Sequence, residues 1–164
     1  MNFNESLLLR RREELDELGV RVRFIGRRGG RTPARVRTRM DKTVAMTARN
    51  RRMTLTFAFN YGGRAELADA MKTIGQEVAA GRLDPNKINE KTIGRHLYAP
   101  DMPDPDLLVR TSGEFRISNY LLWELAYSEL VFTDVLWPDF RREHLWDAIR
   151  EFQRRERRFG DIGK

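Results

Sequence analysis

The sequence predicts an α/β fold with a mostly parallel sheet and covering helices, for two reasons. Short strands rich in β-branched or aromatic residues alternate with longer segments of helical periodicity, the order that produces parallel sheets. The composition, with 40% hydrophobic residues, three Trp and nine Phe, is typical of a globular core rather than a disordered chain. A length of 164 residues fits one domain, and no repeat or linker divides it, so we expect a single domain over residues 1–164.

The first elements alternate as this fold class requires. Residues 1–18 have helical character, and Gly19 is placed as the stop signal of that helix. The segment VRVRFIG, residues 20–26, predicts a strand. After a glycine-rich loop, Pro33 opens a second helix that extends to about Asn50. The apolar stripe of this second helix consists of Val36, Met40, Val44 and Thr47.

The middle of the chain repeats the pattern. Residues 53–60, MTLTFAFN, alternate large apolar with small side chains and predict a buried strand. A third helix follows and ends at Gly81, and Asn89 caps a shorter helix that extends to His96. The side chains expected to bury the third helix are Leu67, Met71, Ile74 and Val78.

The last third predicts two more strands and a helix. The strands are DLLVR, residues 106–110, and ELVFTD, residues 129–134. An amphipathic helix over about residues 141–158 is expected to bury Leu145, Ile149 and Phe152. The aromatic residues expected in the core are Trp123, Tyr127, Phe132 and Trp137. Because the chain opens in a helix with no strand before it, we expect an incomplete sheet that lacks its N-terminal βα units.

Composition limits the kinds of function. There is no cysteine and there are two separated histidines, so neither disulfides nor a zinc site is predicted. No apolar run reaches the length of a membrane span and no signal-peptide layout opens the chain, so we expect a cytoplasmic protein. The net charge of +7 favours anionic partners. We expect no nucleic-acid partner, because no RNA-binding motif and no basic–aromatic alternation is present.

Ligands of open parallel sheets bind beyond the carboxyl ends of the strands, and three predicted strand ends carry unusual residues: NYGGR, RTSGEFRIS and the region from WELAYSELVFTD to WPDF. In NYGGR, residues 60–64, a glycine pair allows close backbone approach, although such pairs are more often plain turns. In RTSGEFRIS, residues 110–118, Arg110, Arg116 and Ser118 suit the oxygens of a phosphate. The alternative is that these arginines pair with local acids such as Glu114.

Two carboxylates lie in strongly apolar surroundings. Glu124 and Glu129 belong to the segment WELAYSELVF, and a buried carboxylate requires a partner. That partner is either an arginine or a hard cation such as Mg²⁺ held together with diphosphate oxygens. From the residues alone, the arginine is the favoured partner.

Three stretches resemble the signatures of the cis-prenyltransferases, the undecaprenyl diphosphate synthase family. Residues 106–140, DLLVRTSGEFRISNYLLWELAYSELVFTDVLWPDF, resemble the long C-terminal signature of this family. FNYGGR, residues 59–64, resembles an earlier signature, and RRFG, residues 157–160, the terminal one. The similarity extends in order from about Asn4 to Gly160. It implies a Mg²⁺-dependent transferase that condenses isopentenyl diphosphate with an allylic diphosphate and makes a polyprenyl diphosphate, the precursor of a lipid carrier.

The resemblance also implies roles for individual residues. Arg110, Arg116, Ile117 and Ser118 would bind the isopentenyl diphosphate, and Glu129 would be a ligand of Mg²⁺ in place of an arginine partner. The family forms homodimers, in which Arg158 and Gly160 would reach towards the partner's site. Asn60 and Arg64 would support the site rather than bind substrate. The lipid product would bring the protein into peripheral contact with a membrane.

The chain departs from the family pattern in three ways. The Asp-Gly-Asn-Gly-Arg-type loop with the catalytic aspartate would precede residue 1, so we expect an N-terminally truncated domain without a catalytic residue and inactive alone. Phe115 stands where a polar residue is usual, and Glu124 where Gln is usual. Two alternatives to an enzyme fragment stay open: a non-catalytic subunit, or a basic module that binds anions or RNA on the same fold.

Overall fold

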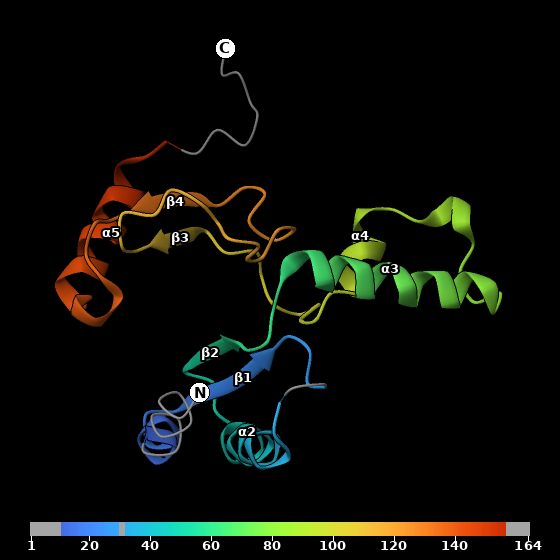
Figure 1. Cartoon of the computed structure of the whole chain (residues 1–164), viewed down its shortest axis with the longest axis horizontal. Coiled ribbons are helices and arrows are strands. Elements are labelled where there is room, and N and C mark those ends of the chain that lie inside the picture. Colours follow the sequence, from blue (N-terminus) through green and yellow to red (C-terminus); the bar gives the residue numbers. More distant parts are fainter. Residues whose placement is uncertain (1–10, 30–31, 157–164) are drawn as a thin grey trace. The chain divides into compact units, whose positions relative to one another are not determined.

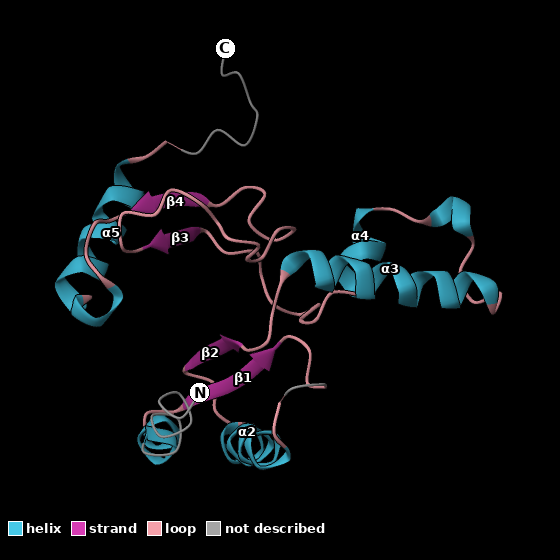
Figure 2. Cartoon of the chain, viewed as in Figure 1, coloured by secondary structure: helices cyan, strands magenta, loops and turns pink. Residues whose placement is uncertain are grey.

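The structure, a computed structural model, describes residues 11–29 and 32–156. The chain divides into two compact units, Met1–Ala99 and Pro100–Lys164. Each unit contains a pair of parallel strands, and helices make up most of the remaining regular structure (Figure 1; Figure 2). The predicted α/β class is therefore confirmed, with two short parallel sheets. Within the described residues no helix combines the length and the apolar character needed to cross a membrane.

The first unit contains a β-α-β arrangement. Strand β1, Val20–Ile25, pairs in parallel with β2, Met53–Ala58, with Val20 opposite Met53 and Ile25 opposite Ala58. Helix α2, Ala34–Thr47, connects the two strands and packs on β1. Residues 11–17 are helical before Gly19, whose φ of +69° turns the chain into β1 as predicted.

Threonines rather than aliphatic residues form much of the buried face of α2. Met40, Thr43 and Thr47 are its buried residues. The hydroxyl of Thr47, fully buried, donates to the carbonyl of Thr43 at 2.9 Å and accepts from the backbone N–H of Val22 at 3.0 Å. The helix thereby satisfies a donor of β1 that would otherwise be buried without a partner. The predicted helix ran to Asn50, which instead leaves the helix and donates from its side chain to the carbonyl of Val20 at 3.0 Å.

The rest of the first unit consists of helices. Helix α3, Gly63–Ala79, is followed by the 3₁₀ turn η1, Pro85–Lys87, and by α4, Glu90–Arg95. The side chain of Asn89 accepts from the N–H of Thr92, and the Thr92 hydroxyl accepts from the N–H of Asn89, which confirms the predicted cap. Ile74 is buried, but Met71, also predicted to be buried, is 54% exposed.

The second unit pairs β3, Leu107–Arg110, with β4, Glu129–Phe132, again in parallel. The 3₁₀ turn η2, Trp137–Asp139, leads to helix α5, Arg142–Arg154, which packs on β4. The prediction that α5 extends to about residue 158 is wrong. Arg155 already has an extended backbone, and its guanidinium donates to the carbonyl of Leu130 at 3.0 Å.

Several apolar side chains predicted to be buried lie at the surface. On strand β2, Met53 is 52% exposed, because within the described residues β1 is the only strand that pairs with β2. Tyr127 and Trp137 are more than 70% exposed, and Leu145 is 43% exposed. Periodicity predicts which residues share a face, but it does not determine whether another element covers that face.

Candidate functional site

The loops after β2 and β3 share a strained backbone. Among the described residues, left-handed φ angles at non-glycine positions occur only in these two loops, at Asn60, Ser112, Ser118, Asn119 and Leu121. Such conformations cost about 1–3 kcal/mol each and persist where the surrounding structure enforces them, often at ligand-binding sites. Both loops follow the carboxyl ends of parallel strands, where the fold class places its ligands.

Arg110 ends β3 at the start of the second loop. The loop continues the ladder beyond the strands: Thr133 donates to the carbonyl of Arg110 at 2.9 Å, and Ser112 donates to the carbonyl of Val135 at 2.9 Å. The backbone of Arg110 is thus held firmly. Its side chain is half-buried, and in the described part of the chain no acidic side chain pairs with it. A half-buried guanidinium without a carboxylate partner is suited to an anionic ligand.

Arg116, Ile117 and Ser118 follow in the same loop, so the structure places four of the predicted binding residues on one segment. Arg116 forms an ion pair with Glu114, the local partner that the sequence offered as the alternative. The arginine side chain is 64% exposed, and ion pairs at such exposure contribute little stability. This contact can therefore exchange for an anionic ligand at small cost. The substrate-binding roles of these residues stay predictions.

Glu129 lies at the other end of the β3–β4 sheet. It opposes Leu107, three positions before the Arg110–Phe132 pair, so register separates it from Arg110 by about 10 Å along the strands. Its carboxylate accepts from the guanidinium of Arg155 at 2.8 Å, and this hydrogen bond is the main cause of the raised pKa of Arg155. The structure thus contains the arginine partner that the residues alone favoured for Glu129.

The Mg²⁺ ligand role of Glu129 stays a prediction. Within residues 11–29 and 32–156, no three acidic or histidine side chains gather as a metal site. Magnesium sites in proteins commonly use one or two carboxylates completed by substrate phosphates. Glu129 therefore fits such a site only when diphosphate oxygens supply further ligands. Arg158 and Gly160, the remaining predicted residues, lie outside the described part of the chain.

Glu124 is buried, as the sequence predicted, with 6% of the residue exposed. It lies near Tyr120, whose pKa is raised first by burial and second by the negative charge of Glu124. A second buried carboxylate, Glu66 of α3, was missed by the sequence analysis. It accepts from the hydroxyl of Tyr61 and, at 2.8 Å, from the backbone N–H of Tyr98. Glu66 thus joins α3 to Tyr61 of the NYGGR segment and to the chain at Tyr98.

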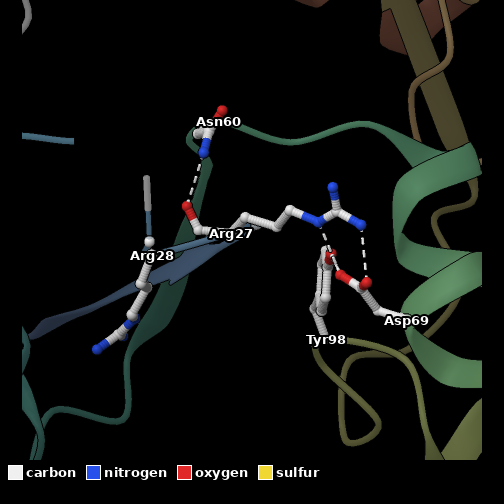
Figure 3. A pocket seen from close by; sticks show the side chains of 7 residues that line it. Arg27, Arg28, Asn60, Asp69 and Tyr98 are labelled. Atoms are coloured by element: carbon white, nitrogen blue, oxygen red, sulfur yellow. Dashed lines mark hydrogen bonds and ion pairs between the residues drawn. The ribbon is translucent and has the colours of Figure 1, made fainter. Parts of the chain in front are cut away.

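A pocket at the carboxyl end of β1 was also missed. It has a volume of about 800 Å³ and is lined by Gly26, Arg27, Arg28, Gly29, Asn60, Asp69 and Tyr98. Arg27 reaches Asp69 with a two-pronged contact at 2.8 and 2.7 Å, and Tyr98 donates to the same carboxylate at 2.5 Å. Arg28 points away from this group (Figure 3) and pairs with Asp41 at 2.9 Å. The signal in the sequence was the polar GRRG segment immediately after a strand.

The Arg27–Asp69–Tyr98 network binds three separate segments together. Asn60 adds a hydrogen bond to the carbonyl of Arg27 at 2.9 Å (Figure 3). The role expected for Asn60, support of a diphosphate site, stays a prediction. The hydrogen bonds from Arg27 and then Tyr98 lower the pKa of Asp69 from 3.8 to about 2. Burial and then the hydrogen bond to Asp69 raise the pKa of Tyr98 from 10.0 to about 12.

These shifts predict a dependence of stability on pH in two windows. As the pH falls below about 4, Asp69 of the unfolded chain takes up a proton before Asp69 of the folded chain, so the stabilising contribution is lost as the pH approaches 2. Above pH 10, the unfolded chain loses the Tyr98 proton first, and stability falls towards pH 12. Urea unfolding of the protein and of Asp69→Asn across the acid window checks this: the variant should show a smaller loss. Equal losses would contradict it.

Comparison with known proteins identifies the relatives of the chain. A family model described as putative undecaprenyl diphosphate synthase matches residues 1–160. Isoprenyl transferase 2 of Streptomyces avermitilis is 55% identical over 160 residues, which are 98% of this chain and 56% of that protein. Decaprenyl diphosphate synthase of Mycobacterium leprae is 50% identical over 98% of this chain and 54% of its own length. The chain thus spans about half the length of these curated relatives.

Solved structures give the same result. Lavandulyl diphosphate synthase from Lavandula x intermedia, in complex with dimethylallyl diphosphate, superposes with a TM-score of 0.91 at 33% identity, covering 96% of this chain and 68% of that one. A probable undecaprenyl diphosphate synthase from Campylobacter jejuni gives a TM-score of 0.83 at 29% identity, covering 98% and 72%. The chain is therefore similar in sequence and in structure to proteins that make prenyl diphosphates.

Proposed function

Because this chain belongs to the undecaprenyl diphosphate synthase family of cis-prenyltransferases, we propose that it supplies the isopentenyl diphosphate site of such an enzyme. The reaction is the condensation of isopentenyl diphosphate with an allylic diphosphate, and its product is a polyprenyl diphosphate. The names of its relatives, isoprenyl transferase and decaprenyl diphosphate synthase, support this reaction class.

The observation that carries the proposal is Arg110. A guanidinium forms two parallel hydrogen bonds with phosphate oxygens, and its strength as a donor increases when it is partly shielded from water. Arg110 is half-buried at the end of β3 and has no acidic partner among the described residues. It therefore offers a charge that a diphosphate would neutralise.

The loop after Arg110 completes the binding surface in this proposal. Arg116 leaves Glu114 and turns to the diphosphate, the Ser118 hydroxyl donates a hydrogen bond, and Ile117 contributes its backbone N–H. The left-handed backbone at Ser112 and Ser118 fixes the course of the loop before substrate arrives, which reduces the entropic cost of binding. A preorganised set of donors also suits the negative charge that grows on a departing diphosphate.

Magnesium, homodimer formation and a cytoplasmic location belong to the same proposal. Glu129 would hold Mg²⁺ together with diphosphate oxygens, and the ion would then neutralise charge on the leaving diphosphate. Arg155, the present partner of Glu129, would retain its hydrogen bond to the carbonyl of Leu130 and its contact with Glu151. In a dimer, Arg158 and Gly160 would serve the partner's site.

Calorimetric titration with isopentenyl diphosphate tests the proposed function. We expect saturable binding of isopentenyl diphosphate and none of isopentenol, because the diphosphate supplies the attraction. A companion assay measures the elongation of farnesyl diphosphate, the allylic substrate, with labelled isopentenyl diphosphate. If isopentenyl diphosphate does not bind at low salt in the presence of Mg²⁺, the proposed site is wrong.

A substitution of Glu129 tests its metal role separately. In Glu129→Gln, the gain in isopentenyl diphosphate affinity caused by Mg²⁺ should disappear, since a neutral amide is a poor ligand for this ion. Glu151→Gln is the matched control: it also removes a carboxylate next to Arg155, at 3.4 Å, yet has no proposed metal role. If Mg²⁺ raises the affinity for isopentenyl diphosphate equally in Glu129→Gln and in the parent protein, Glu129 is not a metal ligand and serves only as the partner of Arg155.

A further inference from the structure

We propose that the amino edge of the β1–β2 sheet is a docking surface for an anionic lipid bilayer. This surface, the basic edge, consists of Leu18, Arg21, Met46, Arg49, Arg51, Arg52 and Met53. The inference goes beyond diphosphate binding and does not depend on it, because it is drawn from a different part of the first unit.

Backbone contacts bring the basic edge together. Arg52 donates its N–H to the carbonyl of Gly19 at 3.1 Å, and Asn50 donates its side-chain amide to the carbonyl of Val20 at 3.0 Å. Val20 lies opposite Met53 in the sheet. The turn after α2, the start of β1 and the start of β2 therefore form one continuous edge.

Among the described residues, no acidic side chain forms an ion pair with the arginines of this edge. These arginines, Arg21, Arg49, Arg51 and Arg52, are exposed. The acidic residues nearest in the chain are Asp16, which accepts from the side chain of Asn50 at 2.9 Å, and Glu17.

The distribution of charge along the whole chain agrees with this. Residues 1–99 contain 21 Lys and Arg against 11 Asp and Glu, whereas residues 100–164 contain 10 against 13. The positive excess of the protein therefore lies entirely in the first unit. A single-sign field of this kind concentrates anionic partners near the surface that carries it.

Exposed apolar side chains on the same edge favour a bilayer over a nucleic acid. Leu18 is 48% exposed, Met46 38% and Met53 52%. Arginines beside apolar side chains match the boundary between lipid headgroups and acyl chains. Binding of single-stranded nucleic acid instead uses aromatic stacking, and no aromatic residue is among the large exposed hydrophobic residues described in the first unit.

The position of the basic edge leaves the other end of the sheet accessible. Parallel strands place all their amino ends together, so the basic edge lies opposite the edge where Gly26, Arg27 and Asn60 line the pocket. A protein attached to a bilayer through the basic edge would keep that pocket open to solvent.

Vesicle flotation with the full chain tests the inference. Binding to phosphatidylcholine vesicles that contain phosphatidylglycerol should be strong at low salt and weak at high salt, and pure phosphatidylcholine should bind little. The triple variant Arg49→Gln/Arg51→Gln/Arg52→Gln should weaken binding about a hundredfold, since each arginine near an anionic surface contributes about 1 kcal/mol. Leu18→Ser/Met46→Ser/Met53→Ser should reduce the binding that persists at high salt.

A matched control separates the basic edge from net charge. Lys87→Gln/Lys91→Gln/Arg95→Gln removes three exposed cations from the same unit and should keep binding within about twofold; circular dichroism verifies that all variants are folded. Equal losses in the control and the arginine variant would overturn the inference. It is also overturned if anionic vesicles do not bind, or if the arginine variant loses affinity for a single-stranded RNA but not for vesicles.

Discussion

Replacing Gly26 by Ala should destabilise the first unit by about 3 kcal/mol or more, from backbone strain and overlap together. Gly26 has a φ of +112°, which residues with a side chain rarely adopt. An added Cβ would lie 2.2 Å from the carbonyl oxygen of Phe59, a backbone atom just after β2 whose residue is held by a hydrogen bond to Ile25. The variant must either distort the β1–β2 sheet or open the pocket that Gly26 lines.

Far-ultraviolet circular dichroism during urea unfolding measures this effect. The matched control is Gly75→Ala, since Gly75 lies in α3 and an added Cβ would meet nothing within 4 Å. Alanine is the better helix former by about 1 kcal/mol, so Gly75→Ala should stabilise the protein. We therefore expect the same glycine-to-alanine change to lower the free energy of unfolding at position 26 and to raise it at position 75. If Gly26→Ala unfolds at the same urea concentration as the parent protein, the close approach at Phe59 is wrong.

The substitution Arg110→Ala should weaken the binding of isopentenyl diphosphate by roughly a hundredfold, or about 3 kcal/mol, the size of a lost pair of charge-assisted hydrogen bonds. The effect should exceed that of Arg116→Ala. Arg110 is half-buried and has no acidic partner in the described chain, whereas the exposed Arg116 already has Glu114 and must give up that contact.

Arg110→Lys distinguishes geometry from charge. Lysine keeps the positive charge but lacks the planar fork, so its affinity should fall between those of the parent protein and the alanine variant. Arg150→Ala removes an exposed arginine of α5 that pairs with Asp147 and should leave binding unchanged. Titration calorimetry at constant ionic strength measures the parent protein and the four variants. If Arg110→Ala and Arg150→Ala bind isopentenyl diphosphate with equal affinity, Arg110 does not belong to the binding site.

The elements that depend on local signals were predicted well. Asn89 at the start of α4 and Gly19 before β1 act through their own backbone or through residues three positions away. The paired strands also lie where alternation placed them, because pleating acts over neighbouring residues. The C-terminal ends of α2 and α5 were not predicted. After α2, Asn50 forms a long-range hydrogen bond to Val20, and after α5, Arg155 forms one to Leu130.

The candidate site shows the same division. The signature around Arg110, Arg116, Ile117 and Ser118 indicated one loop, and these residues do lie on one segment after β3. The sequence did not reveal the fork from Arg27 to Asp69, because the two residues are 42 positions apart and no spacing rule links them. For Glu129 the sequence offered two possible partners, an arginine and a metal ion. Only the tertiary structure shows which arginine it is: Arg155 donates a hydrogen bond to the Glu129 carboxylate.

The sequence by itself determined the α/β class, the order of the elements and the kinship with prenyl diphosphate synthases, because these depend on periodicity and on contiguous signatures. Only the tertiary structure decided which charges are paired, which apolar side chains stay exposed and which arginines gather at the amino edge of the β1–β2 sheet. The physical reason is that pairing and exposure are properties of surfaces assembled from distant segments. The residue type of a carboxylate or a guanidinium does not show in the sequence which distant side chain it pairs with.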